Sequence, residues 1–302
     1  MGMRKSYERG GISRFTTIIL NFFFILVSIL FVIPFLYVVA ISVTPESLVY
    51  TEGYRLFPTE LTTLSYELIF RNPGILLNAY KISIVVTLFG AAFGLLISTM
   101  LAYQLTRKDF KYRNAVSFFV FFTMLFNGGL VPWYLVVTKI LHIQDTLLAM
   151  VLPYSVVPIF VLFLKGYLSS IPMELYESAK IDGCNEFKTF FLIAIPLSKP
   201  GLATVGLLFT LMYWNDWFLS LMFIDRNDLV PLQAMLYRLM NNVDFLTRNA
   251  GKMTGIKIDI NKLPSESLRM AVMVVAAGPM LFIFPFFQKF FIKGLTVGSV
   301  KG

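Results

Sequence analysis

The chain has 302 residues, of which 57% are hydrophobic and 14% are charged. Because soluble proteins have about 45–50% apolar and about 25% charged residues, the composition excludes a soluble protein and indicates a membrane protein. One Cys and one His exclude a disulfide framework and a thiolate or imidazole metal cluster, so we expect no metal site. The net charge of +9 would suggest a nucleic-acid partner in a soluble protein. In a membrane protein the first question is on which side of the membrane the basic residues lie.

Six apolar segments approach or exceed the roughly 20 residues that a transmembrane helix needs. They are residues 18–43, 82–103, 115–137, 146–164, 202–224 and 270–292. The first is too long for a cleavable signal peptide and has no small-x-small cleavage site, so it predicts an uncleaved helix. Several segments contain Pro and Gly, which are tolerated only where neighbouring helices or a wet cavity satisfy the freed backbone groups, so we expect a packed, partly hydrated bundle. We therefore expect an all-α membrane protein with six transmembrane helices.

The distribution of Lys and Arg predicts the orientation, because basic connecting segments stay in the cytoplasm. With the N-terminus inside, the cytoplasmic side carries 15 of the 26 bases and six of the 17 acids, which accounts for the whole net charge without nucleic acid. This places a six-span domain at 18–292, with cytoplasmic segments at 1–17, 165–201 and 293–302. Residues 44–81 and 225–269 are then extracellular and either contain short elements that face a partner or form solvated loops.

The longest cytoplasmic connection, between the fourth and fifth spans, is predicted to contain helices. Pro172 suits a helix start, Glu174 lies in the first turn, and Gly183 suits a helix end. Asn185 suits the cap of a second helix. Leu175, Ala179 and Ile181 are expected near one side of the first helix. Such a helix either docks on another protein or lies in the membrane interface.

The connection resembles the EAA loop of ABC-transporter permeases, with Glu177-Ser178-Ala179, Gly183 and Ile193-Ala-Ile195-Pro196 at the family spacing. Ser178 and Ile195 depart from the family residues but keep small or branched apolar size. The longer string from Ile171 to Gly183 resembles the carbohydrate-uptake, maltose-type importer branch. The resemblance implies that the first helix is a coupling helix. Its predicted contacts with an ATPase are Glu174, Glu177, Ser178, Ala179, Asp182, Gly183 and Pro196.

The resemblance further implies a non-enzymatic permease subunit in the bacterial plasma membrane, multi-pass, with cytoplasmic N- and C-termini. The sequence contains no Gly-x-x-x-x-Gly-Lys-Ser/Thr motif, so ATP and Mg²⁺ are expected on two partner ATPase subunits and no cofactor on this chain. A second permease subunit, forming a heterodimer, and an extracellular solute-binding protein are the other implied partners. The cargo is expected to be an oligosaccharide.

Two further stretches resemble parts of this family. The C-terminus resembles a permease tail that reaches toward the ATPases, which implicates Gly298, Lys301 and Gly302, although a frayed terminus is the alternative. The stretch from Asn127 to Tyr134 resembles a subgroup for complex oligosaccharides.

The predicted substrate path is the aromatic and polar cluster of the fifth span. Tyr213, Asp216 and Trp217 are expected on one helix face, with Asn127 and Trp133 as further candidates, because sugars bind aromatic faces and planar polar groups. Asp216 is the only ionisable residue at membrane depth, which by default marks a functional position. The alternative is an aromatic belt at the outer interface, with Asp216 capping a helix or pairing with a base.

Two other function classes fit the sequence less well. An ion-coupled secondary sugar carrier needs several buried acids or His as a relay, and only Asp216 is available. A membrane glycosyl- or phosphotransferase needs converging carboxylates or metal ligands, whereas Asp225 and Asp228 lie in an outer segment without visible partners. We therefore expect no catalytic residue.

Overall fold

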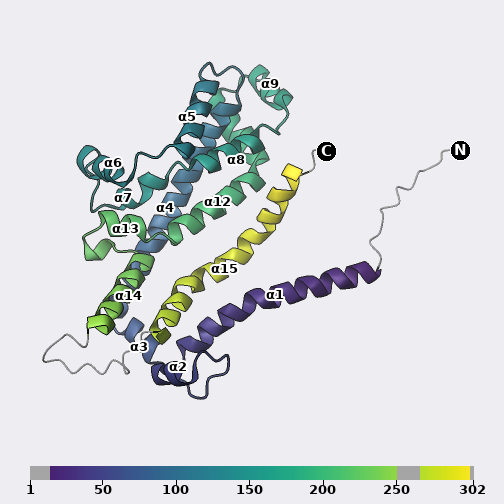
Figure 1. The fold of residues 1–302 in the computed structure, drawn as a ribbon. Coiled ribbons are helices and arrows are strands. Elements are labelled where there is room, and N and C mark those ends of the chain that lie inside the picture. The colour runs from purple at the N-terminus through teal and green to yellow at the C-terminus, as the bar shows by residue number, and fades with distance from the viewer. Residues whose placement is uncertain (1–13, 250–265, 300–302) are drawn as a thin grey trace. The chain divides into compact units, whose positions relative to one another are not determined.

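The computed structural model describes residues 14–249 and 266–299 (Figure 1). Within these ranges every regular element is a helix, as the composition predicts. The chain divides into two compact units, Met1–Ile69 with Val243–Val275 and Phe70–Asn242 with Ala276–Gly302. Each unit is described by itself.

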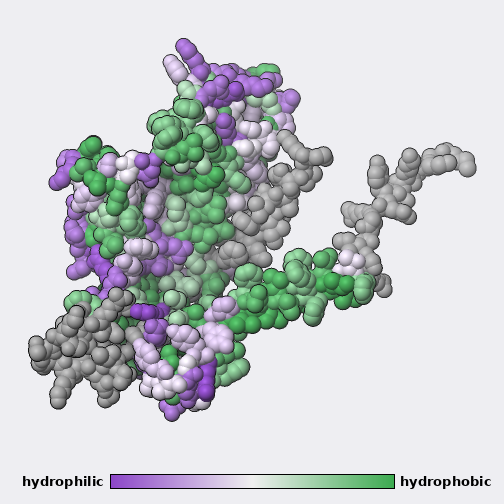
Figure 2. Space-filling model, viewed as in Figure 1, coloured by the Kyte–Doolittle hydropathy of each residue, from purple (hydrophilic) through white to green (hydrophobic). Residues whose placement is uncertain are grey.

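The first unit begins with α1, Arg14–Ser42, which confirms the helix predicted over 18–43. Its apolar side chains are exposed along nearly the whole helix, and Figure 2 shows this surface in green. A helix that is apolar on all sides and unburied is suited to lipid. α2, Glu46–Glu52, and α3, Leu64–Phe70, follow as the short elements expected in the first outer segment.

A buried carboxylate holds the start of α15, Glu266–Ser299, in this unit. Glu46, 6% exposed, accepts hydrogen bonds from the backbone nitrogens of Glu266 at 2.9 Å and Ser267 at 3.0 Å. The hydroxyl of Ser267 also donates to Glu46 at 3.0 Å. The first N–H groups of a helix have no partner within it, so Glu46 supplies one from a distant part of the chain.

The second unit is built around α4, Pro73–Thr106, against which α5 (Arg113–Leu125), α8 (Pro158–Leu168) and α12 (Lys199–Trp214) pack (Figure 1). The other α-helices that begin here are α6 (Leu130–Leu135), α7 (Leu147–Val151), α9 (Met173–Ile181), α10 (Glu186–Thr189), α11 (Ile195–Leu197), α13 (Phe218–Phe223) and α14 (Leu232–Asn249). Single π or 3-10 turns are η1 (Val136–Ile140), η2 (Leu152–Tyr154), η3 (Phe190–Ala194) and η4 (Asn227–Leu229).

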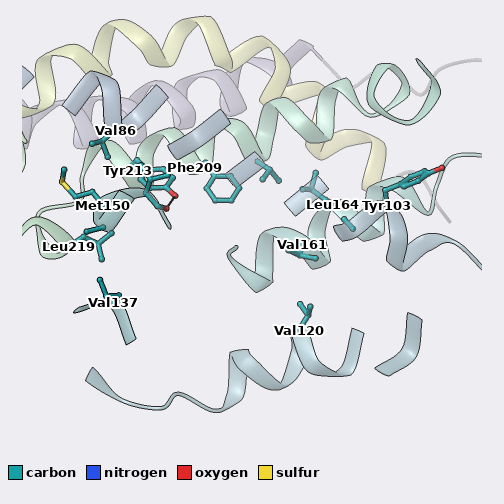
Figure 3. Close-up of a cluster of buried hydrophobic side chains, with 14 of the residues drawn as sticks. Val86, Tyr103, Val120, Val137, Met150, Val161, Leu164, Phe209, Tyr213 and Leu219 are labelled. Atoms are coloured by element: carbon teal, nitrogen blue, oxygen red, sulfur yellow. Dashed lines mark hydrogen bonds between the residues drawn. The ribbon is translucent and has the colours of Figure 1, made fainter. Parts of the chain in front are cut away.

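Glycines on α4 allow the rings of α12 to lie close to its backbone. A Cβ on Gly90 would come within 2.6 Å of the Tyr213 ring, and one on Gly94 within 2.8 Å of the Phe209 ring. Small residues at helix contacts are what permits close packing in a membrane. Both rings belong to the buried apolar cluster of this unit, with Val86, Met150 and Leu219 around them (Figure 3).

Two of the predicted segments break at Gly and Pro, whereas α1 continues through Pro34 and α15 through Pro279 and Pro285. The segment predicted at 115–137 bends by 118° between Arg113–Leu125 and Leu130–Ile140, at Gly128 and Gly129. The segment predicted at 146–164 bends by 53° between Leu147–Tyr154 and Pro158–Leu168. Such breaks free backbone groups that need new partners. At Val151 the carbonyl accepts a 2.7 Å hydrogen bond from the buried Tyr213 hydroxyl.

Two helices of the described residues, Phe15–Ser42 and Pro73–Thr106, are each long and apolar enough to cross a membrane. The number rises to five if each of three bent helix pairs is one span. The segment predicted at 270–292 falls within α15. Several bounds differ from the prediction: α4 begins at Pro73, inside the first outer segment, and α15 begins at Glu266, inside the second. The second outer segment also contains the 18-residue helix α14.

Candidate functional site

The predicted coupling helix is α9, Met173–Ile181, and it begins directly after Pro172. Its buried face consists of Tyr176, 3% exposed, and Ala179, 4% exposed. The expected grouping of Leu175, Ala179 and Ile181 on one side is wrong, because Leu175 and Ile181 are exposed and Tyr176 packs instead. Glu174, Glu177 and Ser178 are also exposed.

The turn after α9 has the geometry that the glycine predicts. Asp182 is the C-cap, and Gly183 has φ +77°. The Gly183 N–H donates to the Lys180 carbonyl at 3.2 Å, and the Cys184 N–H to the Ala179 carbonyl at 2.9 Å. These two bonds close a helix end that requires a left-handed residue.

Asn185 then caps α10, Glu186–Thr189, because its side-chain oxygen accepts from the Lys188 N–H at 2.8 Å, as predicted. The chain continues through η3 to α11, where Pro196 lies exposed. All seven predicted coupling residues are thus on one segment, six of them around α9 and its turn, and Pro196 in α11, beyond α10 and η3.

Replacing Gly183 with alanine is expected to loosen α9. A residue with a Cβ in the left-handed region costs about 1–2 kcal/mol, although no atom lies within 4 Å of that Cβ. Amide hydrogen exchange of α9 should therefore rise several-fold, and asparagine, which tolerates this conformation, should restore most of the protection. Gly53→Ala is the matched control, since Gly53 has φ +74° and equal free space but lies in the first unit. If amide exchange of α9 is unchanged in Gly183→Ala, the left-handed conformation of residue 183 does not destabilise the helix as predicted.

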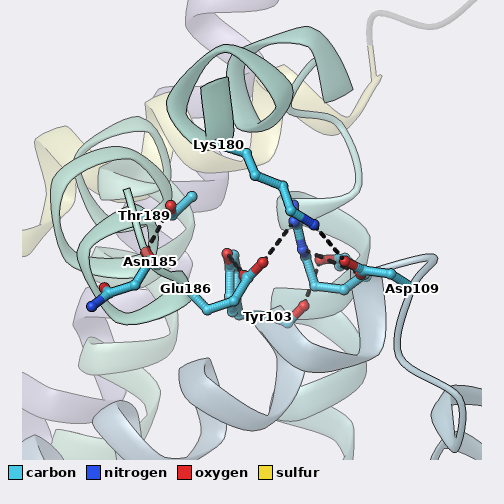
Figure 4. A network of polar contacts seen from close by, with 8 residues as sticks. Tyr103, Asp109, Lys180, Asn185, Glu186 and Thr189 are labelled. Atoms are coloured by element: carbon cyan, nitrogen blue, oxygen red, sulfur yellow. Dashed lines mark hydrogen bonds and ion pairs between the residues drawn. The ribbon is translucent and has the colours of Figure 1, made fainter. Parts of the chain in front are cut away.

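A polar network anchors this segment to the end of α4 (Figure 4). Arg107, the C-cap of α4, is 4% exposed and pairs through Nη2 with Glu186 at 3.0 Å. The Tyr103 hydroxyl donates to the other oxygen of Glu186 at 2.7 Å. The guanidinium carbon lies 5.0 Å from the ring centre of Tyr176 and 5.7 Å from that of Tyr103. Burial raises the pKa of the Tyr176 phenol, a group that is neutral at physiological pH in any case.

The predicted tail residues lie at or beyond the C-terminal end of the described residues. Gly298 is in the last turn of α15, which runs to Ser299. Lys301 and Gly302 lie outside the described residues.

Asn127 and Trp133 line one cavity of about 600 Å³ beside the break between α5 and α6. The complete lining is Asn127, Gly128, Gly129, Leu130, Pro132, Trp133, Val136, Pro153, Tyr154 and Phe218. The Trp133 indole is nearly parallel to the Phe218 ring, at 11° with ring centres 6.2 Å apart. The wall therefore combines aromatic rings, an amide and a phenol, which are groups that bind the apolar faces and hydroxyls of sugars.

Asp216 adjoins this cavity through Tyr154, whose hydroxyl is hydrogen-bonded to its carboxylate. The same carboxylate accepts the Leu219 N–H at 3.2 Å. Asp216 therefore caps the first turn of α13 and holds a cavity residue at the same time. The capping role is the alternative that the sequence left open.

The prediction that Tyr213, Asp216 and Trp217 share one helix face is wrong. α12 ends at Trp214, and α13 begins at Phe218. Asn and Asp side chains compete with helical backbone bonds, and here Asn215 donates to the Leu211 carbonyl while Asp216 caps the next helix. Tyr213 is buried against Gly90 of α4. Trp217 stacks on Tyr237 with ring centres 4.3 Å apart and does not line the cavity.

Sequence reasoning missed Tyr154, Phe218, Arg107 and Glu186. Tyr154 follows Pro153, so the break of the fourth span was a usable signal for a side chain that lines a cavity there. Nothing in the local pattern pairs Arg107 with Glu186, which are far apart in the sequence. Across the described residues, no group of three His, Cys, Asp or Glu side chains is placed to hold a metal ion.

Known proteins resemble the chain over nearly its full length. Residues 94–297 match the family described as "Binding-protein-dependent transport system inner membrane component". The Bacillus subtilis protein LplC is 38% identical over 90% of each chain. The B. subtilis polygalacturonan/rhamnogalacturonan transport system permease protein YtcP is 35% identical, over 93% of this chain and 96% of that protein. The B. subtilis arabinooligosaccharides transport system permease protein AraQ is 31% identical, over 94% and 96%.

A solved structure has the same fold. It is a chain of a bacterial ABC transporter involved in the import of the acidic polysaccharide alginate, with a TM-score of 0.75 and 24% identity over 93% of this chain and 99% of that chain.

Proposed function

This chain belongs to the family of binding-protein-dependent transport system inner membrane components, and from that premise we propose that it forms half of the membrane pathway of an ATP-driven oligosaccharide importer. The observation that carries the proposal is an exposed, capped helix with the EAA spacing in a chain whose relatives include oligosaccharide transport permeases. The subunit itself is non-catalytic. Two ATPase subunits with bound ATP and Mg²⁺ supply the energy.

The proposed topology has six spans with both termini and α9 in the cytoplasm. The spans are α1, α4, α5 with α6, α7 with α8, α12 with α13, and α15. The excess of basic residues in the segments assigned to the cytoplasm supports this orientation. The bent helix pairs support counting each of the third and fourth spans as two pieces.

The proposed contact with an ATPase is the exposed side of α9. Glu174 and Glu177 provide negative charge there, and Leu175 and Ile181 provide apolar surface, with Ile181 86% exposed. Small Ser178 allows close approach between them. A partner groove with basic residues at its rim and an apolar floor fits this pattern, because charge sets orientation and the apolar core supplies affinity. The tail residues Gly298, Lys301 and Gly302 are proposed to reach toward the same ATPases.

The proposed substrate path includes the 600 Å³ cavity of Asn127, Trp133 and Tyr154. Its lining contains no Lys or Arg, and its polar groups suit hydroxyls. The rest of the path is assigned to a second permease subunit, with which this chain forms a heterodimer. An extracellular solute-binding protein delivers the saccharide to the outer segments.

The test begins with purification of the chain and its bound partners from the native membrane, followed by identification of the co-purified proteins. The complex is then reconstituted in liposomes with labelled arabinooligosaccharides and labelled fragments of polygalacturonan and rhamnogalacturonan. We expect an ATPase, a second permease and a binding protein, and uptake that requires ATP on the side of α9. Uptake that continues without ATP and stops with an uncoupler would instead identify an ion-coupled carrier, which the relatives do not favour.

A further inference from the structure

Arg107 contacts elements on both sides of the turn that follows α9. Its Nη2 pairs with Glu186 of α10 at 3.0 Å, and its guanidinium lies 5.0 Å from the ring centre of Tyr176 of α9. Arg107 itself ends α4, so one side chain connects the long helix of the unit to both arms of the loop. Figure 4 shows Tyr103 beside Glu186, and Lys180 reaching toward Asp109.

The cation of this contact is buried, whereas the side chain of Glu186 is 48% exposed. The Arg107 side chain is 5% exposed, and a buried cation is costly unless it is paired. Nε and Nη1 have no hydrogen-bond partner among the described residues, although Nε lies 3.8 Å from an oxygen of Asp109. The tyrosine rings stand beside the guanidinium and supply cation–π attraction in place of hydrogen bonds.

The neighbouring ion pair is of another kind. Lys180 of α9 lies 3.5 Å from Asp109, but these side chains are 66% and 53% exposed. Exposed pairs contribute little to stability because water and salt screen them. Arg107 and the two rings are therefore expected to hold α9 more firmly than this exposed pair, in addition to the packing of Tyr176 in the buried apolar cluster and of Met173 against it.

We propose that Arg107 is a positioning residue that locks α9 and α10 to the end of α4, so that a push on α9 moves α4 instead of turning the loop at Gly183. Without this lock the loop has a glycine hinge at its centre and an exposed outer face. That an ATPase applies force to α9 rests on the proposed function, whereas the contact of Arg107 with α9 and α10 does not.

The first measurement is amide hydrogen exchange of α9 and α10 in the intact complex. Arg107→Lys keeps the charge and loses the planar group between the rings, and Tyr176→Leu loses one ring. Both are expected to raise exchange about tenfold. Tyr176→Phe removes only a buried hydroxyl without a hydrogen-bond partner in the described structure and should keep the protection. Arg113→Lys is the matched control at the start of α5. Wild-type exchange in Arg107→Lys would overturn the proposal.

The second measurement is the ratio of saccharide accumulated to ATP hydrolysed, with the labelled saccharide that the wild-type complex accumulates. We expect this ratio to fall several-fold in Arg107→Lys with the ATPase still bound, and an unchanged ratio would overturn the proposal. If Arg107→Lys does not assemble, Glu186→Gln replaces it, since the amide keeps an acceptor for Tyr103. A wild-type complex that accumulates no saccharide contradicts the proposed function, and the exchange measurement then still decides on the lock.

Discussion

Replacing Glu177 with lysine is expected to lower ATP-driven saccharide uptake roughly tenfold or more, because reversing a charge at an interface places like charges together at a cost of several kcal/mol. Glu177 is exposed on α9 and makes no hydrogen bond or ion pair with the rest of the described chain. The substitution therefore leaves the fold of the subunit intact. The measurement is uptake in proteoliposomes together with the amount of ATPase that co-purifies.

Glu60→Lys is the matched control for Glu177→Lys. Glu60 is also exposed and changes the net charge by the same amount, but it lies in the segment between α2 and α3. We expect normal uptake and normal ATPase content for this variant. If Glu177→Lys retains both, α9 is not the surface that the ATPase binds, and the coupling role of the loop is wrong.

Replacing Trp133 with alanine is expected to raise the KM for saccharide uptake about tenfold, which corresponds to about 1.4 kcal/mol of lost binding. The indole lines the cavity and stacks on Phe218, so its removal takes away an aromatic face and leaves the amide of Asn127 and the phenol of Tyr154 in place. ATPase binding should not change, since Trp133 is not part of the α9 segment. The measurement is the concentration dependence of uptake of the labelled saccharide.

Phe122→Ala controls for the loss of an aromatic ring from the same bent span. Phe122 stacks on Phe126 with ring centres 4.4 Å apart and is 40% exposed, but it does not line the cavity. Its KM should equal that of the wild type. A KM that rises equally in both variants would show that packing of the span, and not the cavity, controls uptake. A KM that is unchanged in Trp133→Ala would remove the cavity from the substrate path.

The loop shows what can be predicted from sequence. The start of α9 after Pro172, its end at Gly183 and the cap at Asn185 were all predicted, and all are present. Each depends on residues within a few positions of one another, because caps and left-handed turns are local hydrogen-bonding events. Which residues of α9 are buried was not predicted, since what they pack against, Arg107 and Tyr103, belongs to the end of another helix.

The predicted substrate path shows the opposite case. A helical repeat grouped Tyr213 with Asp216 and Trp217, but the helix ends at Trp214 and the three side chains have different surroundings. Tyr154, which links Asp216 to the cavity, comes from a separate span.

The amino-acid sequence alone therefore determined that this is a helical membrane protein, where α9 begins and ends, and which family it resembles. These depend on hydropathy, spacing and local caps. Only the tertiary structure decided that Arg107 joins α4 to both arms of the loop and that Trp133, Asn127 and Tyr154 share one cavity. Such contacts join residues distant along the chain, and their partners are selected by packing, which a one-dimensional pattern does not contain.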